Sequence, residues 1–288
     1  MTDVALFEAE RPALLSLGYR MLGERAGAED VVQETWLRWA AAEQTGIQNP
    51  AAWLRRTATN IAIDVLRSAR SRREDYVGPW LPEPLIDPDE TSPGAKFELA
   101  QECELALLWA MEHLNETERA AFILREAFDA GYDEIAATLN KSEAACRQLV
   151  SRAHKRLGEA GPRFDADEKE VADLIHRFFT ATMAGDRQTA LSLLSPKAVA
   201  VSDGGGKARA ALRPLNGPED ITQVLFAVFT KDQASPDFSF EVAMINRKPC
   251  LCRYHHGILD TVTTLSPDSL GKIAWIYTMR NPDKLSAS

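Results

Sequence analysis

The sequence predicts a multidomain chain in which all-helical domains come first and an α+β domain follows. Apolar residues recur at spacings of three and four through most of the first 160 residues, as amphipathic helices require. A stretch with five prolines and many acids, residues 74–96, interrupts this pattern and predicts a linker. After Gly161-Pro162 short strand-like runs alternate with turn residues. The domains expected from these boundaries are residues 1–73, 97–161 and 165–288.

The composition excludes several classes of protein. The chain has 288 residues, of which 45% are hydrophobic and 26% are charged, so it can bury real cores and is not intrinsically disordered. It has no apolar run of the roughly 18 residues that a membrane-spanning helix needs, and residues 1–11 lack a signal-peptide pattern. Four cysteines do not make a disulfide framework. We therefore expect a soluble cytoplasmic protein with no membrane partner.

The distribution of charge predicts several partner surfaces. The formal net charge of −9 argues against general nucleic-acid binding, for which a basic chain is expected. Two basic stretches nevertheless interrupt the acidic background. Residues 55–73 contain six arginines and one acid, and residues 147–156 contain four basic residues and no acid. Such local basic strips on an acidic chain indicate distinct surfaces for different partners.

The individual elements follow from the periodicity. The helical segments expected are residues 4–22, 28–42, 51–66, 97–114, 165–184 and 218–229. The strands expected are residues 198–202, 239–246, 250–254, 257–265 and 273–279. The last four of these strands follow one another after short turns, and the set predicts an antiparallel meander. Helices followed by such a meander indicate a small α+β domain.

Residues 115–157 have the pattern of a helix-turn-helix. Asn115 and Glu118 can form a capping box, Gly131 ends the helix that they start, and Ser142 can cap the last helix. The outer face of that last helix is polar and basic: Arg147, Gln148, Ser151, Arg152 and Lys155. Forked and cationic donors on such a helix suit base edges and phosphates in the DNA major groove. The alternative is a solvated surface helix of an ordinary bundle.

Three ordered motifs give this helix-turn-helix a family context. They are GAEDVVQETWLRW at residues 27–39, AAWLRRTATNIAIDVLRSARSR at residues 51–72, and LNETERAAFILRE followed by YDEIAATLNKSEAACRQLVSRAHKRL. Together they resemble the extracytoplasmic-function (ECF) σ factors, compact bacterial initiation factors with a σ2 and a σ4 domain. The resemblance implies that residues 1–73 form σ2 and that residues 97–161 form σ4. It also implies an alternative σ factor that directs core RNA polymerase to −35/−10 promoters.

The resemblance implies roles for particular residues. Those expected to bind core RNA polymerase are Asp30, Gln33, Glu34, Leu37 and Arg38. Those expected at the −10 element are Arg56, Asn60, Asp64, Arg67 and Arg70. The face at residues 147–155 would bind the −35 duplex. Trp36 and Trp53 are expected to pack in the core rather than stack on bases, because large aromatics at apolar spacing usually pack.

The residues after 165 resemble a SnoaL-like domain of the NTF2 fold, a curved sheet over helices that encloses a conical cavity. The strings WLPEP, DGGGK and NPDKL match the σ factors that carry such an extension. We expect these strings to form an interdomain regulatory contact through Trp80, Leu81, Pro82, Glu83, Pro84, Asp203, Gly204, Gly205, Gly206, Lys207, Asn281, Pro282, Asp283, Lys284 and Leu285. Lys207 or Lys284 is expected to pair with Glu83. Through this contact the C-terminal domain would pack on the linker and the helical domains, and would act as a built-in modulator.

No catalytic residue, metal site or cofactor is expected. Cys250, Cys252, His255 and His256 lack a second ligand pair and fit alternate strand positions, so they do not predict a metal site. Candidate proton carriers in a SnoaL-like pocket have no paired base and orienting group; they are Asp203, Asp260 and His176. The chain is therefore predicted not to be an enzyme.

The partners implied by the resemblance are core RNA polymerase, through its β′ clamp and β flap, and promoter DNA. The sequence leaves open whether the C-terminal domain binds a small-molecule ligand. No obligatory separate anti-σ factor is expected. Two other functions also remain open: a one-component helix-turn-helix regulator with a ligand-sensing domain, and a SnoaL-like cyclase or isomerase with an accessory helical domain. The regulator does not need the polymerase face or the α-helix with Asn60, Asp64 and Arg67, so co-purification with core polymerase separates it from a σ factor. Turnover of a candidate substrate by residues 165–288 alone would favour the enzyme.

Overall fold

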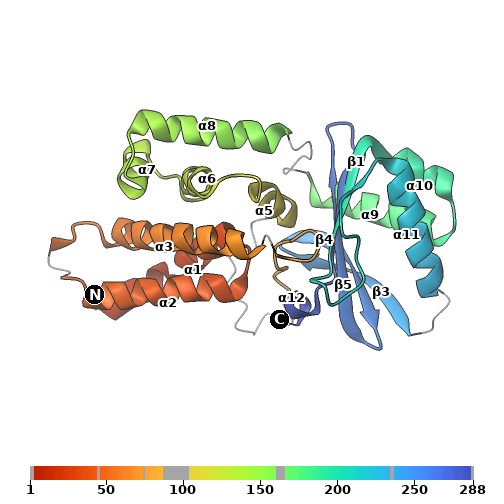
Figure 1. The fold of residues 1–288 in the computed structure, drawn as a ribbon, viewed down its shortest axis with the longest axis horizontal. Coiled ribbons are helices and arrows are strands. Elements are labelled where there is room, and N and C mark those ends of the chain that lie inside the picture. Colours follow the sequence, from red (N-terminus) through yellow and green to blue (C-terminus); the bar gives the residue numbers. More distant parts are fainter. Residues whose placement is uncertain are drawn as a thin grey trace. The chain divides into compact units, whose positions relative to one another are not determined.

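The computed structural model describes residues 3–43, 46–73, 75–86, 104–159, 166–233 and 237–286. These residues divide into two compact units (Figure 1). The first unit comprises the described residues up to 75 together with 107–159, and the second comprises 76–86, 104–106 and the residues from 166 onward. Residues 76–86, which the sequence assigned to the linker, thus belong to the C-terminal unit. Among the described helices none is long and apolar enough to cross a membrane.

Three helices make the first part of the first unit: α1 (Asp3–Leu22), α2 (Arg25–Ala41) and α3 (Pro50–Arg73). Their shared core includes Leu14, Trp39, Leu54 and Leu66, each 2% exposed or less. α1 and α2 approach closely at Gly18, where a Cβ would lie 2.9 Å from the Cα of Ala28. α3 continues beyond its predicted end at residue 66, since the polar run that follows contains no helix breaker.

The helix α5 (Leu105–Met111) begins in the residues 104–106 that cluster with the second unit and continues into the first. The predicted helix-turn-helix follows as α6 (Glu116–Phe128), α7 (Tyr132–Leu139) and α8 (Glu143–Glu159). The capping box is confirmed: Asn115 Oδ1 accepts from Glu118 N at 2.8 Å, and Asn115 N donates to Glu118 Oε2 at 3.3 Å. Asn140 adopts a φ of 51° between α7 and α8, a conformation that asparagine tolerates. Residues 97–103 of the helix expected at 97–114 lie outside the described residues.

Within the first unit, α6 packs against α1 and α3, and α7 packs against α3. Arg119 of α6 is fully buried at this junction, where its Nε donates to the carbonyl oxygen of Arg20 at 2.9 Å. Arg119 also pairs with Glu112. These bonds fix α6 against the end of α1 and offset part of the cost of burying the guanidinium, while the buried Nη2 of Arg119 has no hydrogen-bond partner among the described residues.

A six-stranded sheet with the order β2-β1-β6-β5-β4-β3 forms the centre of the second unit. Its strands are β1 (Leu194–Asp203), β2 (Leu215–Asn216), β3 (Phe238–Ile245), β4 (Lys248–His255), β5 (Ile258–Pro267) and β6 (Ile273–Met279). Strands β3 to β6 form the predicted antiparallel meander. The prediction is wrong at β1, which pairs with β6 in parallel. The chain crosses from β1 to the far edge and builds the meander back, so β6 arrives beside β1 in the same direction.

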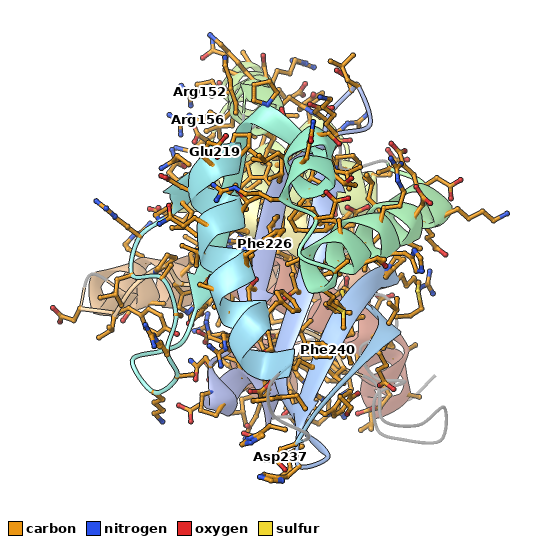
Figure 2. The ribbon with its side chains drawn as sticks, turned by 90° about the vertical axis from the view of Figure 1, so that its right-hand side faces the viewer. Arg152, Arg156, Glu219, Phe226, Asp237 and Phe240 are labelled. Carbon is orange, nitrogen blue, oxygen red and sulfur yellow. The ribbon has the colours of Figure 1, made fainter. Side chains whose placement is uncertain are left out.

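Three helices cover one face of this sheet: α9 (Glu168–Met183), α10 (Arg187–Leu193) and α11 (Pro218–Gln233) (Figure 2). Their side chains share one hydrophobic core with the sheet. A chain of aromatic contacts runs from Phe178 to Phe179, on to Phe229 and then to Phe240, with ring centroids 5.3–5.7 Å apart. These aromatic side chains thus pack in the core between the helices and the sheet.

The opposite face of the sheet is buried as well. Strand residues that lie outside the helix-side core, such as Cys252, Val262 and Tyr277, are 4% exposed or less. The short helix α12 (Pro282–Leu285) packs against β5, and residues 81–85 are all buried. The former linker is therefore a structural part of the C-terminal α+β unit rather than a solvated connector.

Candidate nucleic-acid interface

The exposed face of α8 presents a polar stripe. Arg147, Ser151 and Lys155 follow one another at intervals of four residues, so they lie along one side of the helix beside Gln148, and all four are exposed. The guanidinium of Arg147 lies 2.8 Å from the carboxylate of Glu143 and 4.9 Å from the ring centroid of Tyr132. These two contacts orient Arg147 while 55% of its side chain remains exposed. The stripe has the donors that a major-groove helix requires.

Arg152, the fifth residue predicted on this face, also has an intramolecular partner. Its Nε lies 3.1 Å from Oε1 of Glu118, and Arg156 lies 2.5 Å from Oε2 of the same carboxylate. The Glu118 side chain is only 2% exposed, so this acid joins α8 to the start of α6. Sequence reasoning identified Glu118 as a capping residue but missed this second role.

The residues predicted at the −10 element lie along α3. Arg56, Asp64 and Arg67 are exposed, whereas Asn60 is half-buried and its side-chain amide donates to the carbonyl oxygen of Arg56 at 3.0 Å. The side chain of Arg70 lies outside the described residues. Arg67 forms ion pairs with Asp64, at 3.5 Å, and with Glu116 of α6, at 3.3 Å. The cation predicted to contact DNA thus pairs with the helix-turn-helix.

The residues predicted to bind polymerase lie on α2. Asp30, Gln33, Leu37 and Arg38 are exposed, and Glu34 is half-buried with Oε1 2.8 Å from Nε of Arg38. The Leu37 side chain is 55% exposed. Single exposed leucines are common on protein surfaces, so the assignment of this face to polymerase follows from the family resemblance and not from Leu37.

The two tryptophans expected in the core are half-buried. Trp36 packs against Phe7, and Trp53 against Trp39, with ring centroids 4.9 and 5.4 Å apart. These rings thus contribute to the packing of α1, α2 and α3, as the sequence predicted.

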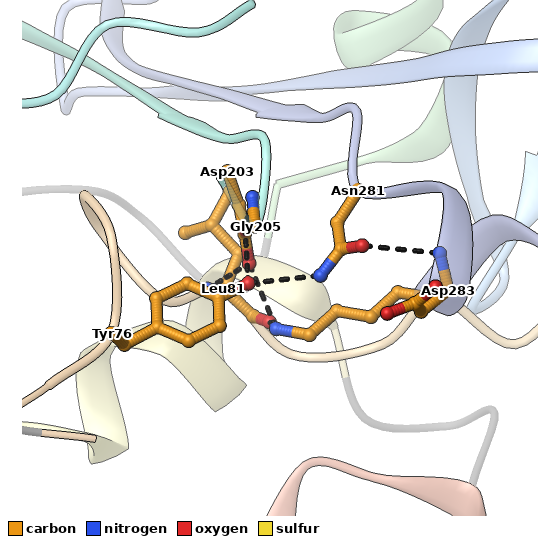
Figure 3. Close-up of polar contacts among 7 residues, drawn as sticks. Tyr76, Leu81, Asp203, Gly205, Asn281 and Asp283 are labelled. Carbon is orange, nitrogen blue, oxygen red and sulfur yellow. Dashed lines mark hydrogen bonds and ion pairs between the residues drawn. The ribbon is translucent and has the colours of Figure 1, made fainter. Parts of the chain in front are cut away.

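In the second unit, the three strings WLPEP, DGGGK and NPDKL come together around Asp203 (Figure 3). The Asp203 side chain is fully buried. It accepts hydrogen bonds from the hydroxyl of Tyr76 at 2.6 Å and from the backbone N–H of Leu81 at 2.9 Å and Gly205 at 2.9 Å. The ammonium group of Lys284 lies 2.8 Å from the same carboxylate. One buried acid therefore receives donors from all three strings.

Lys284 holds residues 76–86 in a second way. Its Nζ donates to the carbonyl oxygen of Leu81 at 2.5 Å and lies 4.1 Å from the ring centroid of Trp80. Leu81 is 3% exposed, while Trp80 is half-buried. Burial, followed by the hydrogen bond to Asp203, raises the pKa of Tyr76 well above its usual range, so the phenol stays a donor.

Both lysines of the strings form ion pairs within this cluster. Lys284 pairs with Asp203, and Lys207 pairs with Asp283 at 2.5 Å. Glu83, which was expected to pair with one of these lysines, is buried.

The glycine loop needs its glycines. A Cβ at Gly204 would lie 2.2 Å from the carbonyl oxygen of Ala208. A Cβ at Gly205, whose φ is +59°, would lie 2.3 Å from Nδ2 of Asn281. Asn281 itself caps α12 and donates to the hydroxyl of Tyr76 at 2.9 Å. The close approach predicted for this loop is confirmed.

Leu85 anchors the end of residues 76–86 and was not predicted from the sequence. Leu85 is 3% exposed, and its backbone N–H donates to Oδ1 of Asn246 at 2.9 Å. The available signal was its spacing, since Leu85 follows the buried Leu81 by four residues in an otherwise Pro-rich stretch.

The structure also shows the environments of the residues considered above as metal ligands or proton carriers. Cys250 and Cys252 are buried, which raises the pKa of Cys250 to about 12 and that of Cys252 to about 11. Burial alone would raise the pKa of Asp260, but bidentate bonds of 2.8 and 2.7 Å from Arg253 hold it below its usual value. His176 is exposed on α9. The structure does not bring these side chains together into one site.

Comparisons with known proteins agree with this arrangement. Residues 6–72 match the family model for Sigma-70 region 2, and residues 104–157 match the model for Sigma-70, region 4. The ECF RNA polymerase sigma factor SigJ of Mycobacterium tuberculosis is 35% identical over 297 residues, covering 99% of this chain and 94% of that protein. The probable ECF RNA polymerase sigma factor SigI of the same species is 31% identical over 194 residues, covering 67% of each.

A solved structure shows the same likeness over the whole chain. The crystal structure of Mycobacterium tuberculosis SigJ matches with a TM-score of 0.77 and 32% sequence identity, covering 99% of both chains. The relationship thus includes the C-terminal α+β unit as well as the two helical regions. The chain belongs to the ECF RNA polymerase sigma factors.

Proposed function

We propose that the chain binds core RNA polymerase and promoter DNA, and that the exposed stripe of α8 contacts the −35 duplex. The observation that carries this proposal is the exposure of Arg147, Gln148, Ser151 and Lys155 on the second helix of a capped helix-turn-helix. A forked donor to a guanine edge contributes about 1–3 kcal/mol of discrimination between base pairs. Arg147 is the best placed residue for that contact because Tyr132 and Glu143 orient it without burying it.

The same proposal assigns α3 to the −10 element and the exposed face of α2 to the β′ clamp. Arg56, Asn60, Asp64 and Arg67 share one side of α3, with Arg70 completing the set in sequence. Arg67 pairs with Glu116, so access to a DNA strand requires this ion pair to open. Such a partly exposed pair contributes about 0–1 kcal/mol, which binding to polymerase and DNA readily exceeds.

We further propose that the C-terminal unit is a built-in modulator that acts through residues 76–86. The segment joins the σ2 and σ4 regions in sequence, yet its backbone is bound by Asp203, Asn246 and Lys284 of the second unit. Any change in that contact alters the length of free chain between the two DNA-binding regions. A chain with its own modulator needs no obligatory separate anti-σ factor.

The proposed modulator role requires no small-molecule ligand. Phe178, Phe179, Phe229 and Phe240 pack against one another between the helices and the sheet. Candidate acids such as Asp203 and Asp260 are bound to lysine and arginine, which suits structure rather than turnover. We therefore place the chain among non-enzymatic transcription factors that act in the cytoplasm, where the bacterial polymerase transcribes DNA.

The test is run-off transcription with core RNA polymerase and the full chain on a promoter from the neighbourhood of the gene. Deletion of residues 281–288 removes Asn281 and Lys284 and should change the transcript yield by severalfold. The matched control is Lys207→Met, which removes only an exposed ion pair to the same tail. Equal yields from the intact and shortened chains would contradict the modulator role, and absence of any core-dependent transcript would contradict the σ-factor role.

A further inference from the structure

Outside the surfaces described above, three metal-binding side chains meet at one end of the sheet. Asp237 directly precedes β3, His255 ends β4, and His256 begins the turn into β5. One ligand atom from each residue lies within 4.8 Å of the others. Within the described parts of the chain no other group of three His, Cys, Asp or Glu side chains meets this condition. Asp237 marks the position in Figure 2.

The backbone holds the three residues in place. The N–H of His256 donates to the carbonyl oxygen of Asp237 at 2.9 Å, which ties the β4–β5 turn to the start of β3. His255 lies opposite Phe238 in the β3–β4 register. His256 has a left-handed φ of 51°, which turns the backbone between two successive histidines. Both imidazoles can therefore face the same carboxylate although they are adjacent in sequence.

Side-chain packing orients the rings further. The His255 ring stacks on Phe238 with centroids 4.6 Å apart and an interplanar angle of 22°. The ring of His256 lies 4.3 Å from that of His255, and its Nδ1 lies 3.6 Å from Oδ1 of Asp237. Ligands that are oriented before binding lose less side-chain entropy when they bind.

The charges around the cluster permit a dication. A cation lies beside the cluster: the guanidinium of Arg253 is 4.8 Å from the centroid of the Phe238 ring, on which His255 stacks. Arg253 forms bidentate bonds to Asp260, which also faces Arg280 at 3.8 Å. Within the cluster itself, the carboxylate of Asp237 supplies a negative charge that attracts a divalent ion.

We propose that Asp237, His255 and His256 bind a first-row transition-metal dication such as Zn²⁺. Two imidazole nitrogens and one carboxylate oxygen are ligands that Zn²⁺ and its neighbours favour, whereas Ca²⁺ and Mg²⁺ need oxygen ligands. The three side chains are exposed, so water completes the coordination shell. The buried thiols of Cys250 and Cys252 take no part, which distinguishes this cluster from a Cys/His site.

Calorimetric titration of the full chain with Zn²⁺ alone tests the proposal. We expect one equivalent of Zn²⁺ whose affinity falls at least tenfold in Asp237→Asn and in His256→Asn. Asparagine at position 256 keeps a residue that tolerates the left-handed backbone, so the turn should survive. The matched control is His176→Asn, which removes an exposed histidine of the same unit outside the cluster and should leave the affinity unchanged.

Two readouts keep the outcome unambiguous. Thermal unfolding without metal should be the same for the wild type and the variants, which separates ligand loss from misfolding. Zn²⁺ should raise the unfolding temperature of the wild type and of His176→Asn more than that of the two cluster variants. Equal Zn²⁺ affinity in all four proteins, or no stoichiometric binding to the wild type, would overturn the assignment.

Discussion

Lys284 and Asp203 form an ion pair at 2.8 Å in which the lysine side chain is 10% exposed and the aspartate is fully buried. The two residues are far apart in sequence, and the same lysine binds the carbonyl oxygen of Leu81. The pair therefore connects the tail, the glycine loop and residues 76–86 of the second unit. Because the pair is buried, removing one charge would leave the other buried without its partner.

Lys284→Met is expected to lower the free energy of unfolding of the second unit by about 3 kcal/mol, because the charge of Asp203 loses its cation in a buried site. Urea denaturation of the full chain measures this loss. The control, Lys207→Met, removes a pair whose side chains are 57% and 61% exposed and should cost less than about 1 kcal/mol. An equal loss of stability in the two variants would contradict the prediction that Lys284 contributes more than Lys207.

Residues 76–86 should become accessible to protease when their anchors are shortened. Leu81→Ala removes a side chain that is 3% exposed and is expected to cost about 2–5 kcal/mol. Trp80→Ala should cost less, because Trp80 is only half-buried, while still releasing its contact with Lys284. Limited proteolysis followed by mass spectrometry locates the cuts. Cuts in this segment at wild-type rates in Leu81→Ala would show that it does not depend on that anchor.

Replacing Arg152 should destabilise the protein more than replacing Arg147, because Arg152 contacts a buried acid. Arg152→Ala removes one of the two cations on the buried Glu118 and is expected to destabilise the first unit by about 1–3 kcal/mol. Arg147→Ala breaks only an exposed i, i+4 pair, for which about 0.5 kcal/mol is expected. Chemical denaturation of both variants compares them. Equal stability would mean that the Glu118 contact contributes little.

The face of α2 that we propose binds polymerase can be tested by charge reversal. Asp30→Arg combined with Glu34→Arg should abolish co-purification with core RNA polymerase at moderate salt while leaving the thermal unfolding temperature close to that of the wild type. The control reverses two exposed acids of the second unit, Asp173→Arg with Glu219→Arg, which changes the net charge equally. Retained binding by the α2 variant would show that this helix face is merely solvated.

Local signals predicted the helical regions well. The Asn115–Glu118 capping box and the left-handed Asn140 depend on neighbours in sequence, so the motif could be read directly. The parallel pairing of β1 with β6 could not, because it joins strands separated by most of the second unit. The short helix α10 was also missed, since seven residues give too little periodicity to distinguish it from a turn.

The contact around Asp203 was predicted only as a meeting of three strings. The apolar residues Trp80 and Leu81 lie in a Pro-rich, acidic segment, which indicated that residues 76–86 pack against another part of the chain. The glycines of DGGGK indicated that its backbone approaches that contact closely. The role of Asp203 as the common acceptor could not be predicted, because it depends on full burial and on donors from distant parts of the sequence. Its carboxylate receives hydrogen bonds from Tyr76, Leu81 and Gly205 in addition to the ion pair with Lys284.

Run-off transcription with core RNA polymerase tests the central claim most directly, namely that α8 of this σ factor binds the −35 element. With wild-type chain, a substitution in the −35 element should lower the transcript yield about tenfold or more. Arg147→Ala should lower the yield on the native promoter by a similar factor while core binding is retained. Yields that depend neither on the −35 sequence nor on Arg147 would contradict the account.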